Sequence, residues 1–226
     1  MTNSYPEAYQ QYLASSKAAV EFHDANWTHT AIMKERAKRL KAARDMLRAV
    51  VPESAGNPDA NGDPRGEVFE KLLLTDADTV AVAANEWAKV EKLLDAGRDL
   101  GQIIKNASRA RLAAILDQFP TSQVALSTTD PEAVISEVQG LAFDRLVGLG
   151  DIGAVAADKT IREAQRVGAW HAVIGQAVHG EVAVSAWSDL HRVAPDEYDA
   201  ANSRDDQESV DMAAKTKAVD ALGLTE

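Results

Sequence analysis

The sequence predicts an all-α protein, a multi-helix bundle of six to eight helices with a long N-terminal helical arm and an acidic C-terminal tail. Alanine, which has the highest helix propensity, is abundant, whereas aromatic residues make up only 5% of the 226 residues. Apolar residues recur with a period of about 3.6 residues, as in amphipathic helices, and clusters of Gly, Pro, Asn and Asp separate the periodic segments.

The first predicted element is the long helical arm, residues 1–51. Pro6 lies where a helix can start, since Pro at an early helical position loses no hydrogen bond. No Gly or Pro follows before Val51, so one continuous helix would contain about 45 residues and span about 68 Å. Asn26 and Thr28 offer an alternative, in which the arm breaks into two helices.

A linker at residues 52–66 separates the arm from a predicted helical core at residues 67–194, and Asp63 caps the helix that starts at Pro64. The further core helices are expected from Thr75 to Ala96, from Leu100 to Phe119, from Thr129 to Val147 and from Asp151 through Ala164. Thr75, Thr129 and Asp151 are the expected N-terminal caps of three of them. Residues 195–226 form the predicted acidic tail, which restarts at Pro195 and contains a short, weak helix from Val210 to Leu222.

Composition excludes several classes of protein. The chain has no cysteine, which excludes disulfides, zinc ribbons and thiol catalysis. The N-terminal segment lacks the basic and apolar regions of a signal peptide, and the most apolar stretch, Val167 to Trp187, contains too many polar side chains for a membrane span. We therefore expect a soluble cytoplasmic protein that binds no membrane, or a virion protein if the chain derives from a phage.

The segment from Met33 to Arg48 is basic, although the protein is acidic. Its seven basic and two acidic residues give a net charge of +5, whereas the rest of the chain carries −16 of the total of −11. We predict that its basic residues bind a partner; they are Lys34, Arg36, Lys38, Arg39, Lys41, Arg44 and Arg48.

The helical period separates these basic residues into two groups. Lys34, Lys38, Lys41 and Arg48 share one face, whereas Arg36 and Arg39 fall inside or beside the apolar face. Because a buried arginine needs a partner, we predict that these two arginines meet carboxylates on another helix. A solvated helix face, pairing with a protein and binding of nucleic acid all remain open, but the run lacks the interleaved aromatic residues that stack on bases.

Residues 189–211 form an acidic counterpart, with eight carboxylates and two arginines. Opposite charges on the arm and on the tail predict that the two segments pair, either within one chain or head to tail between two copies.

Three other motifs suggest binding of a nucleotide or a metal ion, but each lacks part of the expected pattern or has a simpler explanation. Residues 148–153, GLGDIG, match the glycine pattern of a dinucleotide-binding turn, which requires a preceding buried strand. Residues 59–70 resemble a calcium loop, but Pro64 occupies the position that requires glycine. Glu91, Asp95 and Asp99 share one helix face, as metal ligands or as a solvated acidic row. We predict no bound metal and no cofactor.

The leading hypothesis is a non-enzymatic structural or interaction protein that acts by oligomerisation or by docking into a larger assembly, for example as a virion component or assembly factor. Its partners would be further copies of itself or other proteins of the assembly. The alternatives are a nucleic-acid-associated protein that uses the basic helix face at residues 34–48, and a nucleotide-binding enzyme at the glycine turn of residues 148–153.

Overall fold

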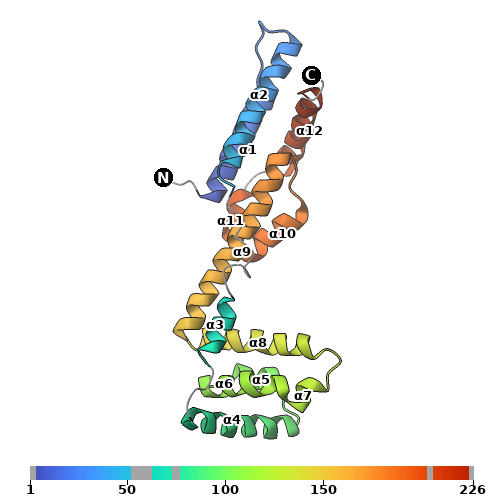
Figure 1. Ribbon diagram of the computed structural model, residues 1–226. Coiled ribbons are helices and arrows are strands. Elements are labelled where there is room, and N and C mark those ends of the chain that lie inside the picture. The colour runs from blue at the N-terminus through green and yellow to red at the C-terminus, as the bar shows by residue number, and fades with distance from the viewer. Residues whose placement is uncertain (1–3, 52–62, 73–76, 203–205, 224–226) are drawn as a thin grey trace. The chain divides into compact units, whose positions relative to one another are not determined.

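The structure is a computed structural model that describes residues 4–51, 63–72, 77–202 and 206–223. Over these residues it contains twelve α-helices and one 3₁₀ helix, and no strand (Figure 1). The all-α fold is confirmed, but the described helices outnumber the six to eight that we predicted. None of the described helices is long and apolar enough to cross a membrane.

The chain divides into two compact units. Unit 1 contains residues 1–57 and 162–226, and unit 2 contains residues 58–161. The boundary lies within α9 (Ile152–His179), so this helix contributes residues to both units. The division differs from the predicted one, in which a single core extended over residues 67–194. Most of the predicted linker, residues 52–62, lies outside the described residues.

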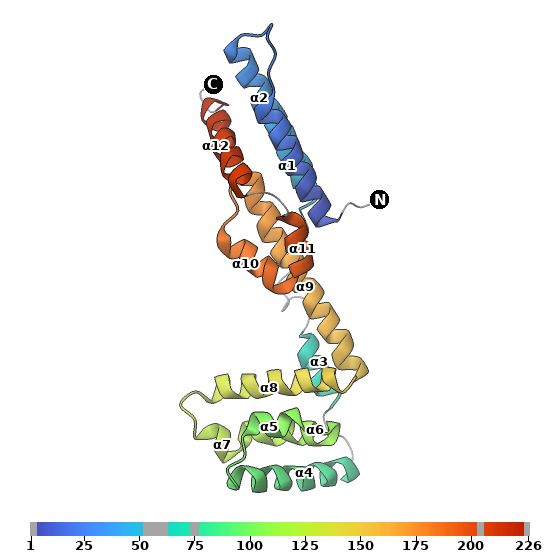
Figure 2. The ribbon, with the colours of Figure 1, turned by 180° about the vertical axis from the view of Figure 1, so that it is seen from behind.

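The N-terminal part of unit 1 is an antiparallel hairpin of α1 (Tyr5–Glu21) and α2 (His29–Arg48), which lie side by side in both views (Figures 1 and 2). Thr28 caps α2 by accepting a hydrogen bond from the backbone N–H of Ala31 at 3.3 Å. The continuous arm helix is therefore wrong, and the alternative break near Asn26 and Thr28 is confirmed.

The remaining helices of unit 1 are the second part of α9, then α10 (Val184–Val193), α11 (Pro195–Ala201) and α12 (Asp206–Gly223). The restart at Pro195 is confirmed, whereas the last helix is longer than we predicted. The main core of unit 1 surrounds Trp170, the largest of the fully buried side chains. The other buried large residues of this core include Tyr9, Tyr12, Leu47, Val173, Ile174 and Leu190.

The helices of unit 2 are α3 (Pro64–Glu70), α4 (Ala77–Asp95), α5 (Leu100–Lys105), α6 (Arg109–Gln118), the 3₁₀ helix η2 (Phe119–Thr121), α7 (Gln123–Leu126) and α8 (Pro131–Gly148). They stack in layers, with α5 and α6 between α4 and α8 (Figure 1). The core between the layers contains Leu112, Ile115, Phe119, Phe143 and Leu146.

Short polar side chains determine where the helices of unit 2 start. Asp63 accepts a hydrogen bond from the N–H of Arg65, as the predicted cap requires. The helix expected from Leu100 to Phe119 is instead two helices, because Ser108 caps a new start by accepting from Arg111 N at 3.3 Å. Asp130, not Thr129, caps α8. The predicted cap at Thr75 lies outside the described residues.

Candidate docking surfaces

The lysines of the basic run form an exposed row on α2. Lys34, Lys38 and Lys41 are all exposed, and their spacing of four and three residues places them on adjacent turns of one face. Arg48 ends this face and donates to Asp45 of the same helix at 2.7 Å. This side of α2 is thus a solvent-exposed basic row.

Two arginines of the run bind residues near the end of α1 and on α2 itself. The Nε of Arg36 donates to the backbone carbonyl of Phe22 at 2.8 Å. The Nε of Arg39 donates to Glu35 at 2.9 Å, and its guanidinium lies 3.9 Å from the centre of the Phe22 ring. The prediction that both arginines meet carboxylates on another helix is therefore wrong.

Arg44 is the basic residue that does meet a carboxylate on another helix. Its Nη1 and Nη2 donate to the two carboxylate oxygens of Asp220 on α12, at 2.9 and 2.7 Å. This hydrogen-bonded pair raises the pKa of Arg44 above its usual value. The side chain of Arg44 is 18% exposed and that of Asp220 is 38% exposed. Arg44 thus pairs within its own chain with an acid that lies outside the predicted acidic segment, residues 189–211.

Where its side chains are described, α12 makes a small apolar contact with the hairpin. Over residues 213–221, the part of α12 whose side chains the structure describes, Val219 is the single buried residue. It packs in a cluster with Ala19, Val20 and the fully buried Leu40. Full burial of one valine contributes about 1.5–3 kcal/mol.

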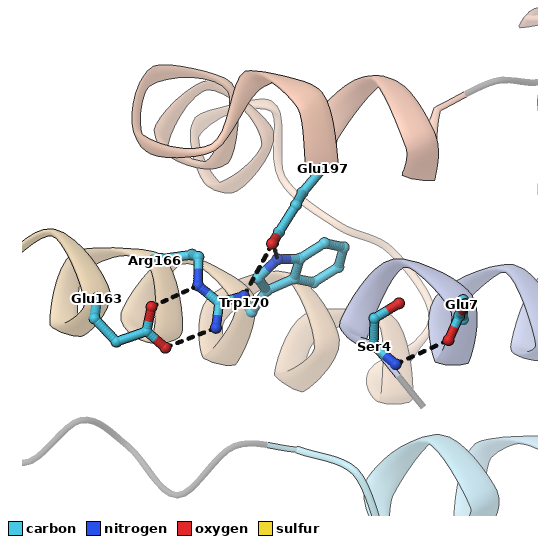
Figure 3. A network of polar contacts seen from close by, with 6 residues as sticks. All are labelled: Ser4, Glu7, Glu163, Arg166, Trp170 and Glu197. Atoms are coloured by element: carbon cyan, nitrogen blue, oxygen red, sulfur yellow. Dashed lines mark hydrogen bonds and ion pairs between the residues drawn. The ribbon is translucent and has the colours of Figure 1, made fainter. Parts of the chain in front are cut away.

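A polar network connects three helices of unit 1 (Figure 3). Arg166 on α9 binds Glu163 of the same helix at 2.7 Å and Glu197 of α11 at 2.9 Å. Glu197 also accepts a hydrogen bond from the indole N–H of the buried Trp170, and Arg166 lies over the ring of Tyr5 on α1. The ion pairs with Glu163 and Glu197 raise the pKa of Arg166. This network has a structural role, since it joins α9 to α11 around the core.

An exposed apolar patch lies at the turn between α8 and α9; we call Leu149, Ile152 and Val155 the turn patch. Ile152 is 87% exposed, and Leu149 and Val155 are also exposed. Ile152 and Val155 lie three residues apart and so share one side of the helix. A recess of about 440 Å³ adjoins Ile152, and charged Lys71, Arg109 and Asp151 line it. An apolar centre with a charged rim is the usual anatomy of a protein–protein interface.

Asp151 organises the backbone beside the turn patch. Its Oδ1 accepts hydrogen bonds from the N–H groups of Gly153 and Ala154, both at 3.1 Å, which confirms the predicted cap. Its Oδ2 accepts from Arg109 at 2.9 Å. The Arg109 guanidinium and these N–H groups hold the pKa of Asp151 below its ordinary value of 3.8.

We predict that Asp151→Ala lowers the free energy of unfolding by about 1 kcal/mol at pH 7, because the first turn of α9 loses its cap. A lowered folded-state pKa means that the carboxylate stabilises the fold above about pH 4, and that this contribution is lost as the pH falls through the lowered pKa. Urea unfolding should therefore show a smaller difference between variant and wild type at pH 3 than at pH 7. Asp144→Ala, at an exposed aspartate of α8, is the control; a difference that stays constant with pH would contradict the prediction.

The glycine turn itself lacks the setting of a dinucleotide site. Gly150 has a φ of +74°, which is the left-handed conformation that glycine favours. The element before the turn is the helix α8, whereas a dinucleotide-binding turn follows a buried strand. The turn therefore serves as the connection between two helices.

The two candidate metal motifs do not form a site in the described residues. Asp99 accepts from the N–H of Gln102 at 2.9 Å and so caps α5, whereas Glu91 and Asp95 are exposed on α4. Within the described ranges, no group of three His, Asp or Glu side chains is placed to hold a metal ion. Asp59 and Asn61 of the calcium-like segment lie outside those ranges.

Comparison with known proteins gives no relative: no family model, no curated protein and no solved structure matches this chain.

The sequence pattern could not identify the turn patch or the Arg44–Asp220 pair. Ile152 and Val155 fit the apolar period of α9, so a pattern predicts them in the core. Arg44 and Asp220 are 176 residues apart, and no local signal connects them. The exposed lysine row, by contrast, follows directly from the helical period.

Proposed function

We propose that this chain is a non-enzymatic structural or interaction protein, which acts by self-association or by docking into a larger assembly, for example as a virion component or assembly factor. The turn patch carries this proposal. An isoleucine that is 87% exposed between two other exposed apolar residues is costly in water, and burial against a second protein removes that cost.

The charged groups beside the turn patch support the same proposal. Arg109 and Asp151 are already paired with each other at 2.9 Å, and Lys71 lines the same recess. A rim of this kind excludes water around an apolar contact and adds specificity. A second copy of the chain offers the same apolar side chains, so a symmetric contact buries the patch of both copies.

The contacts of the basic residues favour association with nucleic acid less than the sequence alone did. Arg36, Arg39 and Arg44 are bound to groups of their own chain, and Arg48 pairs with Asp45. The basic surface is thereby reduced mainly to the lysine row. Nucleotide binding at residues 148–153 is also less favoured, because a helix precedes the glycine turn.

The proposal predicts that Ile152→Asp weakens self-association. Light scattering behind a sizing column should give the wild type a mass that is a multiple of 24.3 kDa and rises with concentration. Loss of two buried isoleucines, one from each copy, would weaken a symmetric dimer by about 3–6 kcal/mol, or roughly two to four orders of magnitude in Kd. The substitution should leave folding unchanged, because Ile152 is exposed.

Val184→Asp is the matched control. Val184 is 80% exposed at the first position of α10, where an acidic side chain is favourable, and it lies outside the turn patch. We expect this variant to associate as the wild type does. A wild type that stays at 24.3 kDa at every concentration and salt condition, or an Ile152→Asp variant that assembles normally, would refute the role of the turn patch.

A further inference from the structure

Over residues 213–221, the part of α12 whose side chains the structure describes, the contacts with the α1–α2 hairpin come from two adjacent residues. Val219 is 2% exposed and fills the small cluster over the hairpin, and Asp220 forms the bidentate pair with Arg44. The other described side chains near them on α12, Lys217, Ala218 and Ala221, are exposed. This described part of α12, held by one buried side chain and one ion pair, can separate from the α1–α2 hairpin at a small local cost.

The hairpin surface beneath α12 is poorly suited to water. Leu40 is fully buried there, and the Nε of Arg44 is a buried donor for which the structure describes no hydrogen-bond partner. If α12 leaves, Arg44 loses both charge-assisted hydrogen bonds to Asp220, and the cluster of Ala19, Val20 and Leu40 loses the side chain of Val219. The bare surface therefore selects a helix with an apolar residue followed directly by a carboxylate.

We propose that this surface is an exchange site, at which α12 of a second copy replaces the chain's own α12. A second copy carries the same Val219 and Asp220, so the contacts of these two residues are regained in the exchanged dimer. Its acidic Asp220 complements the positive charge of Arg44, and the exchange is reciprocal. This inference rests on the proposed self-association. It specifies a second copy of the chain as the partner and the α12–hairpin surface as one contact between the copies.

Charge reversal tests the exchange directly. A chain with Arg44→Asp presents two carboxylates at this site, and a chain with Asp220→Arg presents two arginines, so neither variant can pair within itself. In a mixture, position 44 of each variant meets an opposite charge at position 220 of the other. We expect native mass spectrometry of the mixture to show a heterodimer at twice 24.3 kDa, enriched at least tenfold over either homodimer.

A second measurement keeps the ion pair intact. The chain contains no cysteine, and Arg48 and Lys217 are exposed within about one helical turn of Arg44 and Asp220. One chain carries Arg48→Cys and the other carries Lys217→Cys, and a short bis-maleimide is added to their mixture. An exchanged dimer gives a covalent heterodimer, whereas α12 bound only within its own chain gives none.

The outcomes separate this inference from the proposed function. A charge-reversal mixture that forms no heterodimer, together with no cross-linked product, would overturn the exchange. If the wild type still associates in that case and Ile152→Asp weakens it, self-association through the turn patch stands without the exchange. If heterodimers form equally well when both chains of the mixture also carry Ile152→Asp, the result would support the exchange. It would also show that the turn patch takes no part in the exchange.

Discussion

Replacement of Trp170 by alanine should lower the free energy of unfolding by about 3–5 kcal/mol, which is a large part of the stability of an ordinary domain. Trp170 is fully buried, and its ring lies 5.9 Å from that of Tyr5 and 6.4 Å from that of Tyr9. The variant loses these contacts between α9 and α1 and leaves a cavity. Urea unfolding followed by circular dichroism measures the loss.

Trp170→Phe separates packing from hydrogen bonding. Phenylalanine retains an aromatic ring but lacks the N–H that donates to Glu197, so we expect a loss of about 1–2 kcal/mol in addition to a small packing term. Glu197 keeps its ion pair with Arg166 in this variant. An alanine variant as stable as the phenylalanine variant would show that the indole does not hold the core of unit 1 together.

Phe143→Ala should have an effect of similar size in unit 2, again about 3–5 kcal/mol. Phe143 on α8 is 1% exposed, and its ring packs edge-on against Phe69 of α3 at 6.4 Å. The guanidinium of Arg65 lies 5.1 Å from the centre of the same ring. Loss of this ring should therefore detach α3 from α8, which hydrogen exchange of residues 64–70 can detect.

Phe143→Leu is the control, because leucine keeps the site apolar and fills most of the volume; we expect a loss of about 1–1.5 kcal/mol. Arg65→Ala removes only the cation above the ring and should cost less than 1 kcal/mol. If residues 64–70 exchange in Phe143→Ala as slowly as in the wild type, α3 is held by other contacts and our account of this layer is wrong.

Local chemistry predicted much of the helical fold. The caps at Asp63 and Asp151, the restart at Pro195 and the glycine turn at Gly150 all depend on residues within one helical turn of each other, so the sequence alone reveals them. The prediction failed at Ser108, where a short cap splits a segment that has no Gly or Pro near the break. Serine is too common in helices to mark every new start.

The candidate site was less predictable, because it depends on which apolar and charged residues find partners far along the chain. The period of the basic run placed its lysines in an exposed row, as the structure has them. The same period suggested distant carboxylates for Arg36 and Arg39, yet Arg36 binds a nearby carbonyl and Arg39 a carboxylate of its own helix. Partners such as Arg44 and Asp220 are brought together by tertiary packing alone.

The two-part composition of unit 1 has a consequence for synthesis of the chain. Unit 2, residues 58–161, is contiguous, whereas unit 1 needs residues from both sides of it. The α1–α2 hairpin leaves the ribosome first, but its main partner Trp170 is translated more than a hundred residues later, a delay of about 5–25 s at ordinary elongation rates. Unit 2 can thus complete its fold while the side chains of Tyr9, Tyr12 and Leu47 are still exposed to solvent. The nascent hairpin is therefore the segment most in need of a chaperone.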